Sequence, residues 1–396
     1  MDSILHLRPE LCFPEPPHPS LRVSIIVPAK DEAHLITSTL DALRNQIDAA
    51  GNGISHDIYE VLVLANNCSD ATYEICKTYQ QKFQGFRLYV QCINIEDSIA
   101  HIGTVRRLLM DAAHARLTEV VGKRGIIVST DADSEVDAEW LSQIIEEMDL
   151  NVDVVGGRII PRNTPVLAKI HHLRDVTYRF LKTRLEAELD PCPQNPWPRH
   201  FQCYGPSLAV TCEIYDKAGR IPAIPFLEDE EFRKALKRVD ARMRHSPKVR
   251  VHTSSRLQGR VDFGFSIQLQ EWGNMSLNHE EQMVESLDSA STKFNLKNEL
   301  RHLWIAVKTG RHALLDTNLI AFKLRFDGEQ LLSMINENTY FESLWEIVEQ
   351  HLHQNHADLT LLVPISAAIA EFRTYFASKP TAVTNRMNAE NIAIAV

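Results

Sequence analysis

The first half of the chain alternates short apolar runs with longer stretches in which apolar residues recur every three or four positions. The runs at 23–27 and 126–129 have the length and the side-chain branching of buried strands. Between them, Ile36, Leu40 and Leu43 follow the spacing of one helix face. Further strands are expected at 61–64, 86–90 and 152–156, and further helices at about 70–83, 101–116 and 140–148. This alternation predicts an α/β domain with a doubly wound sheet.

The second half of the chain has a different pattern. A long helix is expected at 167–189, then a proline-rich loop at 191–198, a strand near 204–210, a short helix at 213–218 and a strand at 249–252. From about residue 277 the pattern is almost wholly helical. We therefore expect four parts, namely a proline-rich extension (1–20), the α/β domain (21–275), a helical C-terminal region (276–378) and a flexible tail (379–396).

Acidic residues follow several of the predicted strands at once. Asp131 and Asp133 come directly after the run at 126–129, and Asp31 and Glu32 come soon after the first strand. The C-terminal ends of parallel strands meet at the ligand crevice of an α/β sheet. Carboxylates at that place suit a hard divalent cation and the phosphates it carries. The alternative is that Asp131 only turns a loop or caps the next helix.

Composition narrows the classes of partner and location. The chain of 396 residues has a formal net charge of −10 and no block of Lys and Arg, so we expect no nucleic-acid partner. Its seven cysteines form no C-x-x-C pair, which favours reduced thiols and a cytoplasmic location. No run of about 18 apolar residues predicts a transmembrane helix. Peripheral membrane contact through the helical region stays open.

Two common nucleotide-binding patterns are missing. No G-x-G-x-x-G follows the first strand, which disfavours a dinucleotide fold. No G-x-x-x-x-G-K-[ST] is present, which disfavours a P-loop.

The remaining motifs resemble a known family by their order and spacing, from about Val23 to Trp272. The chain resembles the family 2 glycosyltransferases, and the resemblance implies the GT-A fold, a doubly wound, Rossmann-like mixed sheet, here with a mostly helical C-terminal region. The matching segments are Val27-Pro28-Ala29-Lys30-Asp31-Glu32, Asn66-Asn67-Cys68-Ser69-Asp70, Gly103 with Arg106, Asp131-Ala132-Asp133, Tyr204-Gly205-Pro206-Ser207 and Glu228-Asp229.

The resemblance also implies roles for these residues. Asp133 would bind Mg²⁺ or Mn²⁺ directly, and Asp131 would bridge the ribose and the metal. Asp229 would be the general base, with Glu228 as its neighbour. Two further acids follow directly, so the position of the base stays open by one residue. His252 is a candidate third metal ligand. The donor-binding candidates are Pro28, Lys30, Glu32, Asn67, Asp70, Gly103, Arg106, Asp131, Arg256 and Arg260, and the acceptor-binding candidates are Tyr204, Gly205 and Ser207.

Arg256 and Arg260 are candidates on chemical grounds as well, because they lie four positions apart after a strand and an Arg fork suits phosphate oxygens. Two departures from the family pattern matter. Asn66 or Asn67 stands where many members have an acid that contacts uracil. The Gln-x-x-Arg-Trp motif of processive synthases is missing, so processive synthesis is not expected.

The leading expectation is an inverting, non-processive, metal-dependent glycosyltransferase that moves a sugar from a nucleotide-diphosphate donor, first of all a UDP-sugar, to a hydroxyl acceptor. UDP-glucose, UDP-GlcNAc and GDP-mannose stay open as donors, and so does the acceptor. One alternative is a nucleotidyltransferase, which would usually carry a Gly-rich, Arg-containing loop after the first strand. The other is a non-catalytic nucleotide-sugar binder, which would not need both acidic pairs.

Overall fold

The computed structural model describes residues 11–256, 264–311, 314–355 and 361–379. Contacts within the chain divide it into two compact units. The first unit takes the chain up to Asn163 and the stretch Pro198–Gly264. The second takes Thr164–Trp197 and the chain from Phe265 onward. Each unit is described separately below.

The described part of the first unit is built on an eight-stranded sheet with the order β3-β2-β1-β4-β7-β6-β8-β5. Strands β3, β2, β1 and β4 run parallel, β7 runs antiparallel to both its neighbours, β8 is parallel to β6, and β5 is antiparallel to β8. The strands are β1 (Val23–Ala29), β2 (Tyr59–Asn66), β3 (Leu88–Ile93), β4 (Ile126–Ser129), β5 (Ser134–Val136), β6 (Val154–Pro161), β7 (Leu208–Thr211) and β8 (Met243–Thr253).

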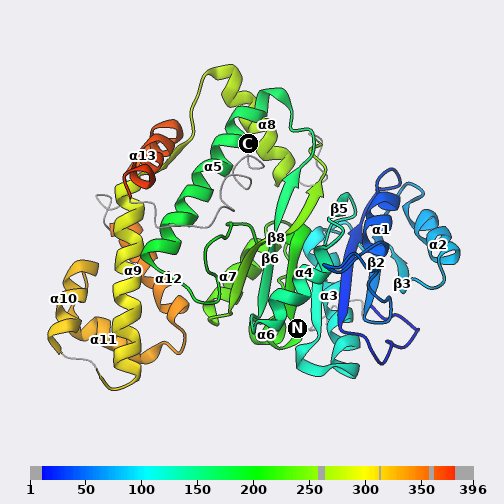
Figure 1. The fold of residues 1–396 in the computed structure, drawn as a ribbon, viewed down its shortest axis with the longest axis horizontal. Coiled ribbons are helices and arrows are strands. Elements are labelled where there is room, and N and C mark those ends of the chain that lie inside the picture. The colour runs from blue at the N-terminus through cyan, green and yellow to red at the C-terminus, as the bar shows by residue number, and fades with distance from the viewer. Residues whose placement is uncertain (1–10, 257–263, 312–313, 356–360, 380–396) are drawn as a thin grey trace, which may run out of the picture. The chain divides into compact units, whose positions relative to one another are not determined.

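Helices cover both faces of this sheet (Figure 1). Val23, Ile25 and Val27 of β1 join one buried cluster with α1 (Ile36–Arg44), α2 (Thr72–Lys82) and α4 (Trp140–Asp149). Ile26 joins a second cluster on the other face, with α3 (Ile102–Val120), α6 (Cys212–Lys217) and α7 (Glu228–Arg238). Because side chains alternate between the faces of a strand, an almost wholly apolar β1 serves both clusters. The predicted α/β fold with a mixed sheet is confirmed.

Four strands differ from the sequence prediction, each for a local reason. β5 has three residues, too few for any periodicity to show. β7 begins at Leu208 because Gly205–Ser207 forms a 3₁₀ turn before it. β6 and β8 are longer than predicted, since their added residues include charged ones that hide the apolar pattern. The longer β6 brings Arg162 and Asn163 to the same edge as the acidic residues.

The second unit is mostly helical in its described part, as predicted. Tyr178 and Leu185 of α5 (Val166–Leu189) share a buried cluster with residues of α9 (Leu287–Lys308) and α13 (Ile365–Ala377). Arg301 of α9 donates to both carboxylate oxygens of Asp190 (3.1 and 2.8 Å) and to Glu342 (3.2 Å). The elements are α5 (Val166–Leu189), α8 (Phe265–Asn278), β9 (Met283–Glu285), α9 (Leu287–Lys308), α10 (Leu314–Leu324), α11 (Gly328–Glu337), α12 (Phe341–Asn355), β10 (Leu362–Pro364) and α13 (Ile365–Ala377).

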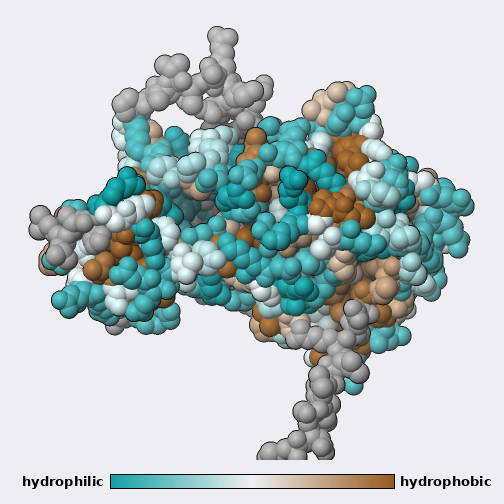
Figure 2. Space-filling model, turned by 90° about the horizontal axis from the view of Figure 1, so that it is seen from below, coloured by the Kyte–Doolittle hydropathy of each residue, from teal (hydrophilic) through white to brown (hydrophobic). Residues whose placement is uncertain are grey.

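The face in Figure 2 is largely hydrophilic, with hydrophobic residues in separate patches. Among the helices that the structure describes, none combines the length and the apolar character that a membrane crossing requires.

Candidate active site

The turn between β4 and β5 carries Asp131 and Asp133 to the edge of the sheet. β4 ends at Ser129, and β5 begins at Ser134 after four intervening residues and pairs with β8, so the intervening backbone reverses sharply. The backbone N–H of Ser134 donates to the carbonyl oxygen of Asp131 (3.2 Å), which closes the turn. The two carboxylates face different neighbours, Asp131 toward Arg106 and Asp133 toward Arg256.

Asp133 is a nearly buried carboxylate, with 12% of its side chain exposed. Burial, followed by the charges of Asp131 and Glu32, raises its pKa to about 6, although Arg256 opposes the shift. Arg256 Nη1 lies 2.9 Å from Glu32 Oε1, and its Nη2 lies 3.3 Å from Asp133 Oδ2. Glu32 and Asp133 thus contact the same guanidinium, and the charge of Asp131 also acts on Asp133.

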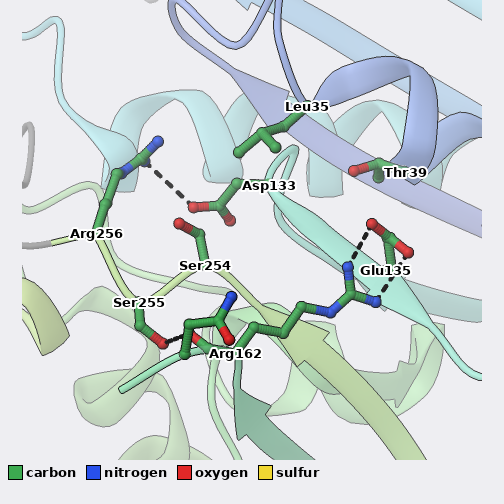
Figure 3. Close-up of a pocket in the computed structure, with 9 residues that line it drawn as sticks. Leu35, Thr39, Asp133, Glu135, Arg162, Ser254, Ser255 and Arg256 are labelled. Carbon is green, nitrogen blue, oxygen red and sulfur yellow. Dashed lines mark hydrogen bonds and ion pairs between the residues drawn. The ribbon is translucent and has the colours of Figure 1, made fainter. Parts of the chain in front are cut away.

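A cavity of about 310 Å³ opens beside Asp133 (Figure 3). Figure 3 shows Arg256 directed at Asp133, and Arg162 paired with Glu135 across the same space. The lining is strongly polar and consists of Leu35, Thr39, Asp133, Glu135, Arg162, Asn163, Ser254, Ser255 and Arg256. Such a lining suits a charged, hydroxyl-rich ligand more than an apolar one.

Arg106 connects the acids of the β4–β5 turn with the acids that begin α7 (Glu228–Arg238). Only 3% of this residue is exposed. Its Nε donates to Glu228 Oε1 (3.0 Å), its Nη2 to Asp131 Oδ1 (3.1 Å), and its Nη1 to the Gly205 carbonyl (3.1 Å) and to Ser129 Oγ. Burial opposes the charged guanidinium, but the carboxylates of Asp131 and Glu228 prevail and raise its pKa. Each guanidinium nitrogen donates to a protein group, so Arg106 positions these groups, and its predicted contact with the sugar donor stays a prediction.

The acids at the start of α7 have different surroundings. Glu228 is 4% exposed and paired with Arg106, and burial raises its pKa although Arg106 opposes the shift. Asp229 is half-buried, and it accepts from the Gly205 N–H and the Glu230 N–H (2.8 Å each). Glu230 forms an ion pair with Arg233 (2.6 Å).

Asp229 itself forms no ion pair with any residue that the structure describes. Its two hydrogen bonds leave lone pairs on both oxygens. Of the four acids that begin α7, it is therefore the one best placed to accept a proton.

Residues near the end of β1 and β2 tie these two strand ends together. Asp31 and Asn67 both have a left-handed backbone, with φ of 52° and 45°. Asp31 Oδ1 accepts from the Ser69 N–H (2.6 Å), and Asp70 Oδ2 accepts from the Ala33 N–H (3.0 Å). Pro28 is buried in β1 and Lys30 is half-buried just beyond it. This arrangement forms one rigid corner of the crevice.

Possible metal ligands also gather in that corner, because ligand atoms of Asp31, Cys68 and Asp70 lie within 4.8 Å of one another. Asp70 Oδ1 accepts from the Thr72 N–H (3.0 Å), so hydrogen bonds to the backbone already use several of these oxygens. A hard divalent cation prefers oxygen ligands, and Cys68 would add a thiol to this group.

Some of the predicted donor- and acceptor-binding residues use their polar atoms in hydrogen bonds within the protein. Asn67 Nδ2 donates to the Ile95 carbonyl (2.8 Å) and its Oδ1 accepts from the Ile95 N–H (3.2 Å), so the loop after β3 uses its amide. Ser207 is 1% exposed and its Oγ accepts from Trp140 Nε1 (3.1 Å), which makes it part of the core. Tyr204 is half-buried.

The two predicted glycines are explained by close packing. A Cβ on Gly103 would lie 2.0 Å from the Ile224 carbonyl oxygen, and a Cβ on Gly205 would lie 2.5 to 2.6 Å from the Arg106 guanidinium. Gly103 thus admits the chain that leads into α7, and Gly205 admits Arg106.

His252 is not brought to the carboxylate pair. Its Nε2 lies 3.1 Å from Asp137 Oδ1, while the next residue, Thr253, donates toward Asp133 Oδ1 (3.5 Å). Successive side chains point to opposite faces of a strand, so Thr253 and His252 cannot both face Asp133. Arg260 lies outside the described residues.

Sequence reasoning missed the residues at the end of β6 and after β8 that line the cavity. Arg162 and Asn163 follow a strand predicted to end at 156, and Ser254 and Ser255 follow a strand that was predicted. These residues could have been found from the sequence by their position, because each polar pair directly follows a strand.

Comparison with known proteins supports the predicted resemblance. Residues 24–196 match the sequence profile of the family described as glycosyl transferase family 2. This segment contains most of β1, the strands β2 to β6 and the Asp131-Ala132-Asp133 turn, and the mixed sheet with helices on both faces agrees with the predicted GT-A, Rossmann-like fold. The predicted enzyme class, a nucleotide-sugar-dependent glycosyltransferase, is confirmed. No curated protein sequence matches the chain.

The solved structures that the chain resembles have low identity to it and low TM-scores. TarS 1-349 of S. aureus in complex with UDP-GlcNAc is 14% identical, with 84% of this chain and 92% of that chain covered and a TM-score of 0.43. The mannosyltransferase PcManGT from Pyrobaculum calidifontis, in complex with GDP-Man and Mn²⁺, is 17% identical, with 93% and 84% covered and a TM-score of 0.39. Likeness at this level transfers no donor and no metal to this chain.

Proposed function

We propose that this protein is an inverting, metal-dependent glycosyltransferase that moves a sugar from a nucleotide-diphosphate donor, first of all a UDP-sugar, to a hydroxyl acceptor. The supporting observation is that buried Arg106 joins Asp131 and Glu228, residues 97 positions apart in sequence. It thereby sets the acids of the β4–β5 turn beside the acids that begin α7. A glycosyltransferase needs both groups in one crevice, one for the leaving diphosphate and one for the acceptor.

The donor side would be formed by Asp131, Asp133 and Glu32, whose oxygens suit Mg²⁺ or Mn²⁺. When bound, such a cation would neutralise the charge that develops on the leaving diphosphate. Asp133 and Asp131 are the proposed ligands, while His252 is left out because it faces Asp137. Arg256 is the proposed guanidinium partner for phosphate oxygens.

The acceptor side would use Asp229. An acceptor hydroxyl has to lose its proton as its oxygen bonds to the anomeric carbon, and a nearby carboxylate accepts that proton. The N–H groups of Gly205 and Glu230 fix the direction of the Asp229 carboxylate. Attack opposite the leaving diphosphate then inverts the anomeric configuration. Gly205 links Asp229 to Arg106, because its N–H donates to Asp229 and its carbonyl accepts from Arg106.

A thermal-shift screen of nucleotide sugars with Mn²⁺ tests this function, because a ligand that binds the folded state raises the melting temperature. We expect at least one UDP- or GDP-sugar to stabilise the wild-type protein, and Asp133→Asn to lose that shift. Release of nucleoside diphosphate should then accompany transfer to an acceptor. No stabilisation by any nucleotide sugar would contradict the proposal, and pyrophosphate release from a nucleoside triphosphate would favour a nucleotidyltransferase.

A further inference from the structure

Arg256 places a positive charge among the acids where the cation of the proposed function would bind. Its guanidinium pairs with Glu32 (2.9 Å) and with Asp133 (3.3 Å), and both carboxylates are nearly buried. Figure 3 shows the Arg256 side chain extending over the cavity toward Asp133. By contacting both carboxylates, this guanidinium offsets part of the cost of placing two like charges in a poorly solvated place.

We propose that Arg256 holds the place of the divalent cation while the donor is absent and transfers its guanidinium to the donor diphosphate when cation and donor bind. This inference rests on the proposed function and adds an exchange of ion pairs to it. Its chemical content is simple: one protein cation alternates between two anionic partners, the Glu32–Asp133 pair and a nucleoside diphosphate.

Electrostatics requires such an exchange if the cation binds at Asp133. A divalent cation beside Asp133 repels the Arg256 guanidinium, because charges of equal sign a few ångströms apart disfavour each other strongly at low dielectric. The guanidinium must then leave its carboxylates. The diphosphate of the donor arrives with the cation and offers oxygens that match the planar donor fork of an Arg.

The surroundings of Arg256 allow the movement, whereas those of Arg106 do not. Arg256 has 34% of its side chain exposed and lines the open cavity. Arg106 has 4% of its side chain exposed and contacts four partners at once. Arg106 therefore fixes the acids in place, whereas Arg256 exchanges its partners.

The affinity of the protein for Mn²⁺ tests the exchange. The exchange predicts that replacing Arg256 tightens Mn²⁺ binding in the absence of nucleotide and weakens it in the presence of nucleotide. Free Mn²⁺ would be measured by electron paramagnetic resonance with the full-length wild type, Arg256→Gln and Arg242→Gln. Arg242 is a matched control because it is similarly exposed, with 39% of its side chain accessible, but pairs with Asp153 (2.6 Å) and does not line the cavity. A second series adds UDP or GDP, whichever raises the melting temperature of the wild type with Mn²⁺.

We expect Arg256→Gln to bind Mn²⁺ alone about 10-fold more tightly, because the competing cation is gone, and Mn²⁺ with nucleotide about 10-fold more weakly, because the phosphate partner is gone. Arg242→Gln should stay within about 2-fold of wild type in both series. If Arg256→Gln fails to fold, Arg256→Lys retains the charge and loses the fork. It should match wild type for Mn²⁺ alone and bind Mn²⁺ with nucleotide more weakly.

Unchanged or weaker binding of Mn²⁺ alone by Arg256→Gln overturns the exchange, as does weaker binding by Arg256→Lys. Asp133→Asn separates this failure from failure of the proposed function. If Asp133→Asn loses Mn²⁺ but Arg256→Gln does not bind it more tightly, the cation site stands and the exchange alone is wrong. If Asp133→Asn binds Mn²⁺ as the wild type does, both the cation site and the exchange are wrong.

Discussion

At the scale of single residues, the site depends on which ionisable side chains are buried and what they contact. Arg106 connects the most groups of the site, because its one guanidinium donates hydrogen bonds to Glu228, Asp131 and the Gly205 carbonyl. A buried charge that loses its partner is strongly destabilising, even where the intact pair adds little to stability. Arg106 therefore matters to folding as much as to chemistry.

Replacing Arg106 tests this point against its neighbour in sequence. Arg106→Gln should lower the free energy of unfolding by about 3 to 5 kcal/mol, because Glu228 is left buried without a cation. Arg107→Gln removes a partly exposed pair with Asp111 and should cost about 1 kcal/mol or less. Urea titrations followed by circular dichroism measure both, and equal losses would contradict the special role of Arg106.

A second prediction at this scale concerns a buried histidine of the first unit. His200 is 5% exposed, and its Nε2 lies 3.0 Å from the Ser246 carbonyl oxygen. Burial, with Arg158 and Arg244 nearby, lowers its pKa to about 3. In the unfolded chain an ordinary His takes up a proton below about pH 6.5, while the folded protein does not, so this residue contributes less and less stability as the pH falls.

We expect the free energy of unfolding of the wild type, relative to His200→Gln, to fall by up to about 1.4 kcal/mol for each pH unit between about pH 6 and pH 4. His34→Gln, which changes an exposed His, should show no such trend. A pH-independent difference between wild type and His200→Gln would mean that His200 is charged in the folded protein.

At the scale of elements, the sequence predicted what local patterns encode. Continuous apolar runs identified β1, β2 and β4, and the acids directly after β4 followed from that assignment. The three-residue β5 and the charged first half of β8 carry no apolar period and were not predicted. Partners far apart in sequence, such as Arg106 and Glu228, could not be derived from spacing, because only the folded chain brings them together.

The start of α3 shows how an element contributes to the site by close approach. Gly103 in its first turn leaves room for the Ile224 backbone, which leads into α7. A methyl group there would lie 2.0 Å from a carbonyl oxygen, and the backbone cannot yield as a side chain can. The spacing of α3 from the 222–228 segment therefore depends on glycine at this position.

Gly103→Ala should lower the free energy of unfolding by about 1 to 3 kcal/mol, a typical cost of overpacking, and should slow transfer because the start of α7 shifts. Gly85→Ala is the matched control, since a Cβ there meets nothing within 4 Å. Thermal unfolding of both variants decides the matter. A Gly103→Ala protein as stable as Gly85→Ala would show that the two segments are not in close contact.

At the scale of the whole molecule, local sequence patterns say least about how the chain is shared between its units. The stretch Thr164–Trp197 leaves the α/β unit and packs with the helices after Phe265 before the chain returns. No motif marks that excursion, because a helix such as α5 shows the same period whichever unit it joins. The predicted boundaries, which place a catalytic domain at 21–275 and a helical region at 276–378, stay a proposal.

The most direct measurement for the central claim, that Asp131 and Asp133 serve the donor while Asp229 serves the acceptor, compares donor binding with turnover in Asp229→Asn. We expect this variant to bind the nucleotide sugar with Mn²⁺ within about 3-fold of wild type and to transfer sugar about 10² to 10⁴ times more slowly. Full activity in Asp229→Asn, or loss of donor binding together with activity, would contradict the account.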